Sequence, residues 1–191
     1  MRVIAGKYKG RRLSTVADLS VRPATDRVKS AIFNTLQTRI DWRTATVLDL
    51  YAGSGSVGIE AMSRGAVHAT FVEFDRKAFA FLQANIALIK AEADATLIFG
   101  SVDQVLASPR QHYSVVFADP PYALPTLHQL PGKIFASGVV EEDGMLVIEH
   151  PTHHEFEHSP LCQAVIEKVY GRTAVTYFTK ANENSTLSGN V

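Results

Sequence analysis

The sequence predicts an α/β protein with a doubly wound, Rossmann-like sheet. From residue 46 onward, short apolar runs alternate with amphipathic stretches, and strands that alternate with helices favour a mostly parallel sheet with helices on both faces. A glycine-rich turn follows the first of these runs, as it does in nucleotide-binding folds of this class. The chain has 191 residues, of which 46% are hydrophobic and 20% charged, which suits one domain of ordinary size and excludes intrinsic disorder. We therefore expect a single domain over residues 1–191.

The elements follow from hydrophobic period and turn signals. A turn at residues 7–10 predicts a short basic β-hairpin extension at the N-terminus, and Thr25 or Asp26 can cap a helix that runs to about residue 40. We expect strands at 46–51, 68–73, 95–99, 113–118 and 145–150, helices at 56–64 and 75–88, a short helix that ends near 107, a helix that ends near 136, and an antiparallel closing pair at 165–170 and 174–179. Residues 1–43 then form a basic extension and helix, 44–180 the core, and 181–191 a loose tail.

The charge is unevenly distributed, although the formal net charge is zero. Residues 1–43 contain ten Lys or Arg and three acids, a net +7, so the other 148 residues carry −7. A basic arm on an acidic body favours a nucleic-acid partner, whereas a solvated N-terminal face without a partner is the plainer alternative. The formal net charge of zero therefore excludes neither alternative, because the charges of the two segments cancel.

Three absences in the sequence guide the choice of compartment. No window approaches the ~18 apolar residues of a membrane span, and the N-terminus turns basic where a signal peptide would become apolar. The one cysteine, Cys162, can form neither an intrachain disulfide nor a four-cysteine zinc site. We expect a cytoplasmic protein, and a monomer.

The glycine turn lies in Asp49–Gly58, where Gly53, Gly55 and Gly58 satisfy G-x-G-x-x-G, and Glu73 ends the next strand. Such glycines let the backbone approach a ligand, and a carboxylate at the second strand end can accept hydrogen bonds from ribose hydroxyls. Asp49 would repel a pyrophosphate but suits the ammonium of S-adenosylmethionine. This favours S-adenosylmethionine over a dinucleotide, and a tight turn with no ligand remains the third possibility.

The run Asp119-Pro120-Pro121-Tyr122 follows the fourth strand, at the same edge of the predicted sheet. The prolines stiffen the loop and remove backbone donors, so that nearby carbonyls stay free to accept. With the Asp119 carboxylate they can hold both hydrogens of an exocyclic amine and favour a pyramidal nitrogen that attacks a methyl group. Tyr122 can stack on an extruded base. A rigid turn without chemistry is the alternative.

At this point the sequence resembles the bacterial ribosomal RNA small-subunit methyltransferase D family, which methylates N2 of a guanine in 16S rRNA. The motifs that support the resemblance, in order, are Met1–Leu13, Arg22–Lys29, Asp49–Gly58, Ser63–Ala66, Phe71–Glu73, Asp119–Tyr122, Val147–His150 and Tyr170-Gly171. Ala24 replaces a family threonine, a small departure.

The resemblance implies roles by position. S-adenosylmethionine would be bound by Asp49, Tyr51, Ala52, Gly53, Ser54, Gly55 and Gly58 at its methionine end, by Glu73 at the ribose, by Ser101 and Asp103 near the adenine, and by Thr25 closing over it. Asp119, Pro120, Pro121 and Tyr122 would hold the target base. Lys7, Lys9, Arg11, Arg12, Arg22, Arg27 and Lys29 would contact the RNA, the partner being 16S rRNA within a small subunit or its assembly intermediate.

Other features and functions remain as weaker alternatives. His150, His153, His154 and His158 have ligand-like spacing but lie in a proline-bracketed segment, so we expect no metal site. Trp42 can touch RNA or anchor the sheet. The rival functions are methylation of DNA adenine N6 or cytosine N4, an NAD-dependent oxidoreductase, and an RNA-binding assembly factor without catalysis.

Overall fold

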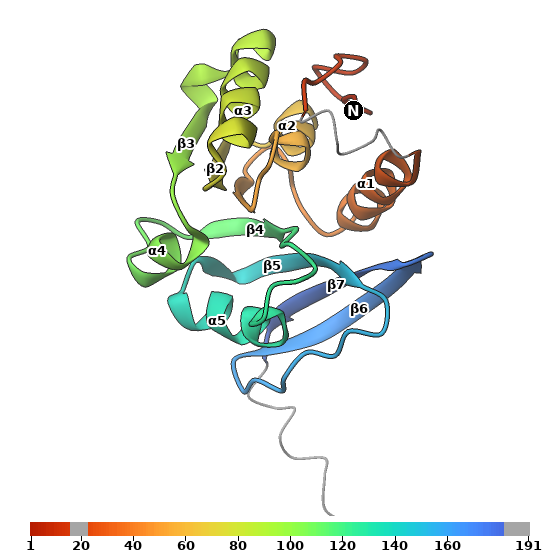
Figure 1. Ribbon diagram of the computed structural model, residues 1–191, viewed down its shortest axis with the longest axis vertical. Coiled ribbons are helices and arrows are strands. Elements are labelled where there is room, and N and C mark those ends of the chain that lie inside the picture. Colours follow the sequence, from red (N-terminus) through yellow and green to blue (C-terminus); the bar gives the residue numbers. More distant parts are fainter. Residues whose placement is uncertain (16–22, 182–191) are drawn as a thin grey trace, which may run out of the picture.

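The protein is built on one seven-stranded sheet in the order β3-β2-β1-β4-β5-β7-β6 (Figure 1). The computed structural model describes residues 1–15 and 23–181. Strands β1 to β5 are parallel, while β7 pairs antiparallel with both β5 and β6. The strands are β1 Thr46–Leu50, β2 His68–Glu73, β3 Ala95–Phe99, β4 Tyr113–Ala118, β5 Val140–Pro151, β6 Cys162–Tyr170 and β7 Thr173–Lys180. The predicted mostly parallel sheet with an antiparallel closing pair is confirmed.

Helices cover both faces of the sheet because alternate residues of each buried strand point to opposite sides. On one face Val47, Phe71 and Phe117 pack against α1, α2 and α3. On the other, Leu48, Val72 and Val116 pack against α4 and α5. The helices are α1 Pro23–Leu36, α2 Ser56–Ser63, α3 Arg76–Ile89, α4 Val102–Ala107 and α5 Leu130–Ser137, with short 3₁₀ turns η1 Glu92–Asp94 and η2 Leu127–Gln129. In the described part of the chain no helix is long and apolar enough to cross a membrane.

The main differences from the predicted boundaries are in α1, in β5 and in β6, which begins at Cys162 and not at Val165. Helix α1 runs from Pro23 to Leu36. Proline fits the first helical position because the amide hydrogen that it lacks would have no partner within the helix there. Strand β5 begins at Val140 rather than Met145, since a register shift opposite 113–115 absorbs the extra residues of the predicted turn. Gly144 lies at this irregularity, where an added Cβ would come 3.0 Å from the Tyr113 carbonyl oxygen.

The N-terminal residues fold back over α2 and α3 as an arm, which we define as residues 1–15. Its predicted hairpin is reduced to one antiparallel bridge between Arg2 and Arg12. The arm is held by buried apolar side chains and by polar side chains beneath it. Gly6, at φ +81°, allows the arm to touch the end of α2, because a Cβ there would lie 1.7 Å from the Ser63 carbonyl oxygen. The arm is therefore part of the packed structure and presents its basic side chains from a fixed position.

Glu60 of α2 is the main anchor of the arm. Its carboxylate is fully buried, and it accepts the amide hydrogens of Ile4 (2.7 Å) and Ala5 (3.0 Å). The same carboxylate pairs with Arg64 at 2.9 Å and lies 4.0 Å from the ammonium of Lys29. Charge-assisted bonds to a buried carboxylate are among the stronger polar contacts in proteins. The arm is thereby fixed to the helix that follows the glycine turn.

Candidate active site

The glycine turn links β1 to α2 through three residues in the left-handed region of backbone space. These are Tyr51 (φ 57°), Gly53 (φ 56°) and Gly55 (φ 81°). Gly55 is required on packing grounds too, since a Cβ would lie 2.4 Å from Leu82 Cδ1. Around Gly53 an added Cβ would meet nothing within 4 Å, so this corner of the turn is open to a ligand. Tyr51 has a side chain in a conformation that glycine adopts more readily, a strain of the kind that concentrates at binding sites.

Asp49 lies beneath this turn as a buried carboxylate. It is 3% exposed, and its Oδ2 accepts the Gly58 amide hydrogen at 2.9 Å. Burial raises the pKa of Asp49 to about 8, and Asp119 and Glu73 push it in the same direction. Gly58 is itself buried, and it leaves no room for a side chain, since a Cβ there would lie 2.3 Å from the ring of Phe71. The backbone amide of Gly58, the third glycine of the motif, therefore fixes the Asp49 carboxylate from the buried side of the turn.

Glu73 ends β2 beside the same turn. Its Oε2 accepts the amide hydrogen of Gly53 and its Oε1 that of Asp75, both at 2.7 Å. Asp75 in turn caps α3 by accepting from Ala78 at 2.8 Å. Two backbone donors thus fix the Glu73 carboxylate at the strand end, where its remaining lone pairs can accept from a ligand's hydroxyl groups.

Ser101 and Asp103 follow β3 and both have structural partners. Ser101 forms a capping box with Gln104 at the start of α4. Asp103, 72% exposed at its side chain, pairs with Lys133 of α5 at 2.6 Å. Asp103 also lies close enough to Tyr51 to act with burial in raising the pKa of that phenol to about 12. The two residues lie just beyond the carboxyl end of β3, and their contact with an adenine stays a prediction.

The Asp119 loop leaves β4 next to the end of β1. The Asp119 amide points to the Leu50 carbonyl oxygen at 3.5 Å, and Leu124 donates to the Pro121 carbonyl oxygen at 2.8 Å, which closes the turn. Pro120 is buried, whereas Asp119 as a whole residue is exposed. Protein nonetheless surrounds the Asp119 carboxyl closely enough that burial raises its pKa to about 6.

Tyr122 ties the end of this loop to the closing hairpin. Its hydroxyl lies 2.8 Å from Thr173 Oγ1, and the side chain is 47% exposed. One edge of the ring is therefore held while the rest of the side chain faces outward, which leaves surface for stacking. The two prolines and this contact make the loop a rigid support.

Four carboxylates from four neighbouring strands share one edge and one face of the sheet. Asp49 pairs in register with both Phe71 and Phe117, so Glu73 and Asp119, each two residues further along, follow on the same side. Val147 pairs with Phe117, which brings Glu149 next to Asp119. Burial and then Asp119 raise the pKa of Glu149 to about 8. Sequence reasoning gave Glu149 no role. The signal available was an acid at the end of the strand that follows Asp119.

A cationic ligand fits this acidic edge. Within the described residues no lysine or arginine forms an ion pair with Asp49 or Glu73. The Asp49 carboxyl, whose pKa burial raises, is stabilised in its ionised form by a nearby positive charge. The ammonium and sulfonium of S-adenosylmethionine supply such charges, and the Glu73 carboxylate suits its ribose. A pyrophosphate would meet repulsion at the same place.

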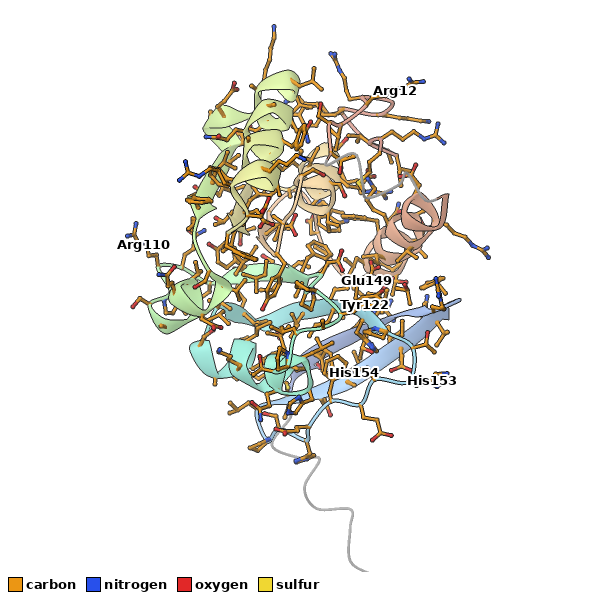
Figure 2. The ribbon with its side chains drawn as sticks, viewed as in Figure 1. Arg12, Arg110, Tyr122, Glu149, His153 and His154 are labelled. Atoms are coloured by element: carbon orange, nitrogen blue, oxygen red, sulfur yellow. The ribbon has the colours of Figure 1, made fainter. Side chains whose placement is uncertain are left out.

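The predicted RNA contacts divide into exposed and buried residues. Lys7, Lys9, Arg11 and Arg12 are all exposed on the arm, and Arg12 projects from it in Figure 2. Lys29 is a correction: it is 2% exposed, donates to the Arg2 carbonyl oxygen at 2.9 Å and faces Glu60, so it braces the arm from below. Burial lowers its pKa. Arg22 and the side chain of Thr25 lie outside the described residues.

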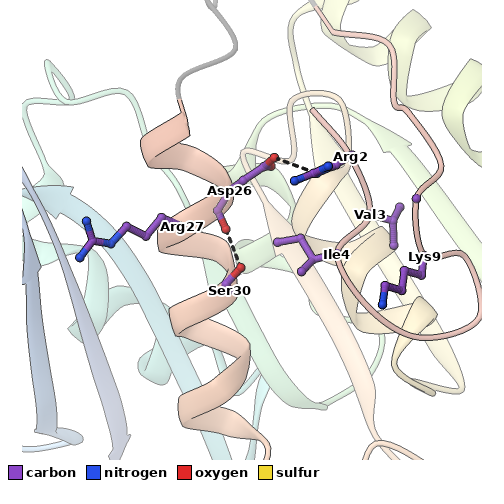
Figure 3. A pocket seen from close by; sticks show the side chains of 8 residues that line it. Arg2, Val3, Ile4, Lys9, Asp26, Arg27 and Ser30 are labelled. Atoms are coloured by element: carbon purple, nitrogen blue, oxygen red, sulfur yellow. Dashed lines mark hydrogen bonds and ion pairs between the residues drawn. The ribbon is translucent and has the colours of Figure 1, made fainter.

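A small hollow of about 380 Å³ separates the arm from α1 (Figure 3). Arg2, Lys9 and Asp26 are among its lining residues, and Arg2 and Asp26 approach to 3.7 Å. Figure 3 shows Arg27 extending from α1 towards β6 and β7. This agrees with the influence of Arg27 on the pKa of Tyr170, which burial raises and Arg27 lowers. Arg27 thus faces the sheet edge where the Asp119 loop lies.

The other residues singled out by sequence have structural surroundings. Trp42 is 8% exposed and its ring lies 5.4 Å from that of Phe33, so it anchors the start of the sheet and does not face RNA. His150 is buried, with Nε2 2.8 Å from Thr176 Oγ1, and burial lowers its pKa. Burial also raises the pKa of the Cys162 thiol. Among residues 1–15 and 23–181, no group of three or more His, Cys, Asp or Glu side chains could hold a metal ion.

This strand order, with a glycine turn and an acidic carboxyl edge, defines an open α/β fold whose ligand binds outside the carboxyl ends of the strands. Solved structures show that this fold is that of a methyltransferase. The chain superposes on "Putative methyltransferase yhhF from Escherichia coli" with a TM-score of 0.83 and 30% identity, over 94% of this chain and 97% of that one. A hypothetical protein from Thermus thermophilus gives a TM-score of 0.79 and 33% identity over 95% and 99% of the two chains.

Sequence comparison narrows the class to a family. The family model described as Conserved hypothetical protein 95 matches residues 1–179. A Bacillus subtilis (strain 168) protein, "Putative rRNA methyltransferase YlbH", is 37% identical over 94% of this chain and 99% of its own length. "Ribosomal RNA small subunit methyltransferase D" of Escherichia coli (strain K12) is 31% identical over 94% and 90%. The chain therefore belongs to this family, that of ribosomal RNA small subunit methyltransferase D.

Proposed function

We propose that the protein transfers a methyl group from S-adenosylmethionine to the exocyclic N2 amine of a guanine in 16S ribosomal RNA. The observation that supports this most directly is the position of the Asp119 loop. The loop leaves the sheet beside Asp49, and Asp119 and Asp49 lie on the same face of the sheet. A cationic methyl donor held by Asp49 and Glu73 would thus stand next to a loop built to hold an amine.

The roles of the residues follow from this arrangement. Bound S-adenosylmethionine supplies an electrophilic methyl group on a good leaving group. Asp49 holds positive charge, and Glu73 accepts from hydroxyl groups. Asp119 and the Pro120 carbonyl accept the two amine hydrogens, which localises the nitrogen lone pair, while Tyr122 supports the plane of the base. Proximity and orientation then account for much of the rate, because the site holds the two reacting groups at one edge. Asp119 or water takes the released proton.

The partner in this proposal is the RNA of the small ribosomal subunit or of its assembly intermediate. The names of the relatives above point to ribosomal RNA, and the exposed cations of the arm suit its phosphates. The proposal also places the protein in the cytoplasm, as a monomer. The lysines and arginines of the arm would set affinity and register more than base choice.

The rival functions meet specific obstacles. Asp49 opposes the pyrophosphate of a dinucleotide. A DNA methyltransferase would need a separate means of recognising its target sequence, and the described fold consists of the sheet, its helices and the arm. An assembly factor without catalysis has no need of a carboxylate that is held next to the cofactor edge.

One experiment decides among these. The protein is incubated with methyl-labelled S-adenosylmethionine and, separately, with assembled small subunits, naked 16S rRNA and duplex DNA, and the modified nucleoside is then mapped. We expect N2-methylguanine in RNA from one of the two RNA substrates. Label in N6-methyladenine, or no label in RNA, refutes the proposal.

Two variants test the roles within the site. Asp119→Ala is expected to abolish methyl transfer while cofactor affinity changes little, and a parallel loss of cofactor binding would show that Asp119 belongs to the cofactor site. Replacing Arg11 and Arg12 by alanine should weaken RNA binding and make its dependence on salt less steep. Exchange of Arg110, an exposed cation remote from the arm (Figure 2), serves as the control.

A further inference from the structure

A second cavity lies on the far side of the Asp119 loop from the glycine turn. Its volume is about 630 Å³, and it is walled by Val28 of α1, by the loop residue Tyr122, and by the turn between β6 and β7. Glu149 lines it, at the end of β5. Figure 2 shows Glu149 and Tyr122 side by side between α1 and β7. The cavity is large enough for one nucleobase with its sugar.

Glu149 and Asp119 stand next to each other at the ends of neighbouring parallel strands. Ala118 pairs in register with Ile148, so the residues that follow lie at the same level. The two carboxyl groups also interact electrostatically: burial raises the pKa of Glu149, and the charge of Asp119 raises it further. An ionised carboxylate has only acceptors. Glu149 therefore presents acceptors to whatever enters the cavity, and the Asp119 carboxyl lies beside it at the end of the neighbouring strand.

The three bases that carry an exocyclic amine differ at the neighbouring ring nitrogen. In guanine the N2 amine stands between N1–H, a donor, and N3, an acceptor, so N1–H and the amine together form a donor–donor edge. In adenine and cytosine the amine stands beside an unprotonated ring nitrogen, which is an acceptor. Two adjacent carboxylates match the donor–donor edge of guanine and repel the acceptor of the other two.

We propose that Glu149 determines the choice of base by accepting the N1–H of guanine while the Asp119 loop holds the N2 amine. This rests on the function proposed above and adds a residue that selects guanine. The rim of the cavity agrees with a nucleotide as occupant. Arg172 is exposed in the β6–β7 turn and His153 is exposed beyond β5, so a cation lies where a phosphate would enter.

The protonation state of Glu149 decides between two readings of the same pocket. A protonated Glu149 would donate to a ring nitrogen and so would favour adenine, or a purine without N1–H. Burial, and after it the charge of Asp119 on the neighbouring strand, raise the pKa of Glu149, so both favour its protonated form when no donor faces it. The N–H groups of guanine are donors, and a cationic cofactor adds positive charge on the Asp49 side. Both shift Glu149 towards the ionised form that guanine requires.

The test compares guanosine with 2-aminopurine riboside at the target position. 2-Aminopurine keeps the N2 amine but has an acceptor at N1 and lacks O6, so the contact assigned to Glu149 is measured by how far Glu149→Gln changes the preference between the two nucleosides. Either nucleoside is placed in the RNA or reconstituted subunit that the mapping experiment identifies as substrate. The kcat/KM for methyl transfer and the affinity for each RNA without cofactor are measured for the wild type and for Glu149→Gln. Glu155→Gln, an exposed glutamate just beyond β5, is the matched control.

We expect the wild type to favour guanosine by about ten- to a hundredfold, the range of one good bidentate contact to a base edge. In Glu149→Gln this preference should fall at least tenfold, chiefly through loss on guanosine, because the amide can donate to N1 of 2-aminopurine. The cofactor affinity and the melting temperature of Glu149→Gln should match the wild type, and Glu155→Gln should leave the preference unchanged.

Three results would overturn the inference. Equal losses on both RNAs would mean that Glu149 supports the pocket without selecting the base. A wild type that prefers 2-aminopurine or adenosine would mean that Glu149 acts as a donor. If the wild type methylates guanine N2 and Glu149→Gln keeps the same preference, only the role of Glu149 is refuted. If the wild type is inactive on both RNAs, the proposed function itself is refuted.

Discussion

Replacing Glu60 by glutamine should destabilise the protein strongly, although the substitution preserves shape. Glu60 accepts two amide hydrogens from the arm, pairs with Arg64 and lies 4.0 Å from the ammonium of Lys29, all around a carboxylate with no exposed surface. Glutamine retains one acceptor oxygen and turns a second acceptor into a donor that faces donors. It also leaves the buried Lys29 without its counter-charge.

The magnitude follows from these contacts. A hydrogen bond to a charged group contributes about 1.5–3 kcal/mol, and breaking a buried ion pair from one side costs about 3–5 kcal/mol. Since the contacts share one carboxylate, they do not add in full. We expect the free energy of unfolding to fall by about 3–5 kcal/mol for Glu60→Gln.

The assay is equilibrium unfolding in urea at pH 7, with Glu92→Gln, an exposed glutamate of η1, as the control. The double variant with Lys29→Met should recover part of the loss, because it removes the unpaired buried ammonium. A loss below about 1 kcal/mol for Glu60→Gln, or a double variant less stable than Glu60→Gln alone, would refute the view that Glu60 anchors the arm through charge.

Three further predictions concern the site. Asp49→Asn should abolish cofactor binding in calorimetry and flatten the pH dependence of stability: a raised native pKa means that stability is lost as pH rises from about 4 to about 8, and the amide removes this loss. Gly58→Ala should cost about 1–3 kcal/mol in thermal unfolding, because its methyl group would lie 2.3 Å from the Phe71 ring; an unchanged melting temperature would contradict this packing. Tyr122→Phe, which removes the hydroxyl that contacts Thr173, should retain most of kcat/KM, whereas Tyr122→Ala should lose about 1–3 kcal/mol of base stacking; equal losses would show that the hydroxyl matters more than the ring.

The sequence by itself determined the parallel core and most of the acidic edge. Alternating strands and helices force a parallel sheet, and in such a sheet the carboxyl ends of the strands meet at one edge. Asp49, Glu73 and Asp119 could therefore be placed together from their positions at three strand ends. The glycines of the turn could also be recognised from the sequence, because the backbone there adopts φ +56° at Gly53 and +81° at Gly55, a region that favours glycine.

Only the tertiary structure decided which charges are buried and which residues share a cavity. Lys29 and Glu60 stand 31 positions apart, so nothing local distinguishes Lys29 from an exposed phosphate contact, and its contacts with Glu60 and with the Arg2 carbonyl of the arm remove it from solvent. Glu149 likewise gained its place from the pairing of β4 with β5 and from the β6–β7 turn across the cavity. Periodicity determines which face of its own element a side chain occupies, while burial and charge–charge contact depend on a partner element brought there by long-range packing.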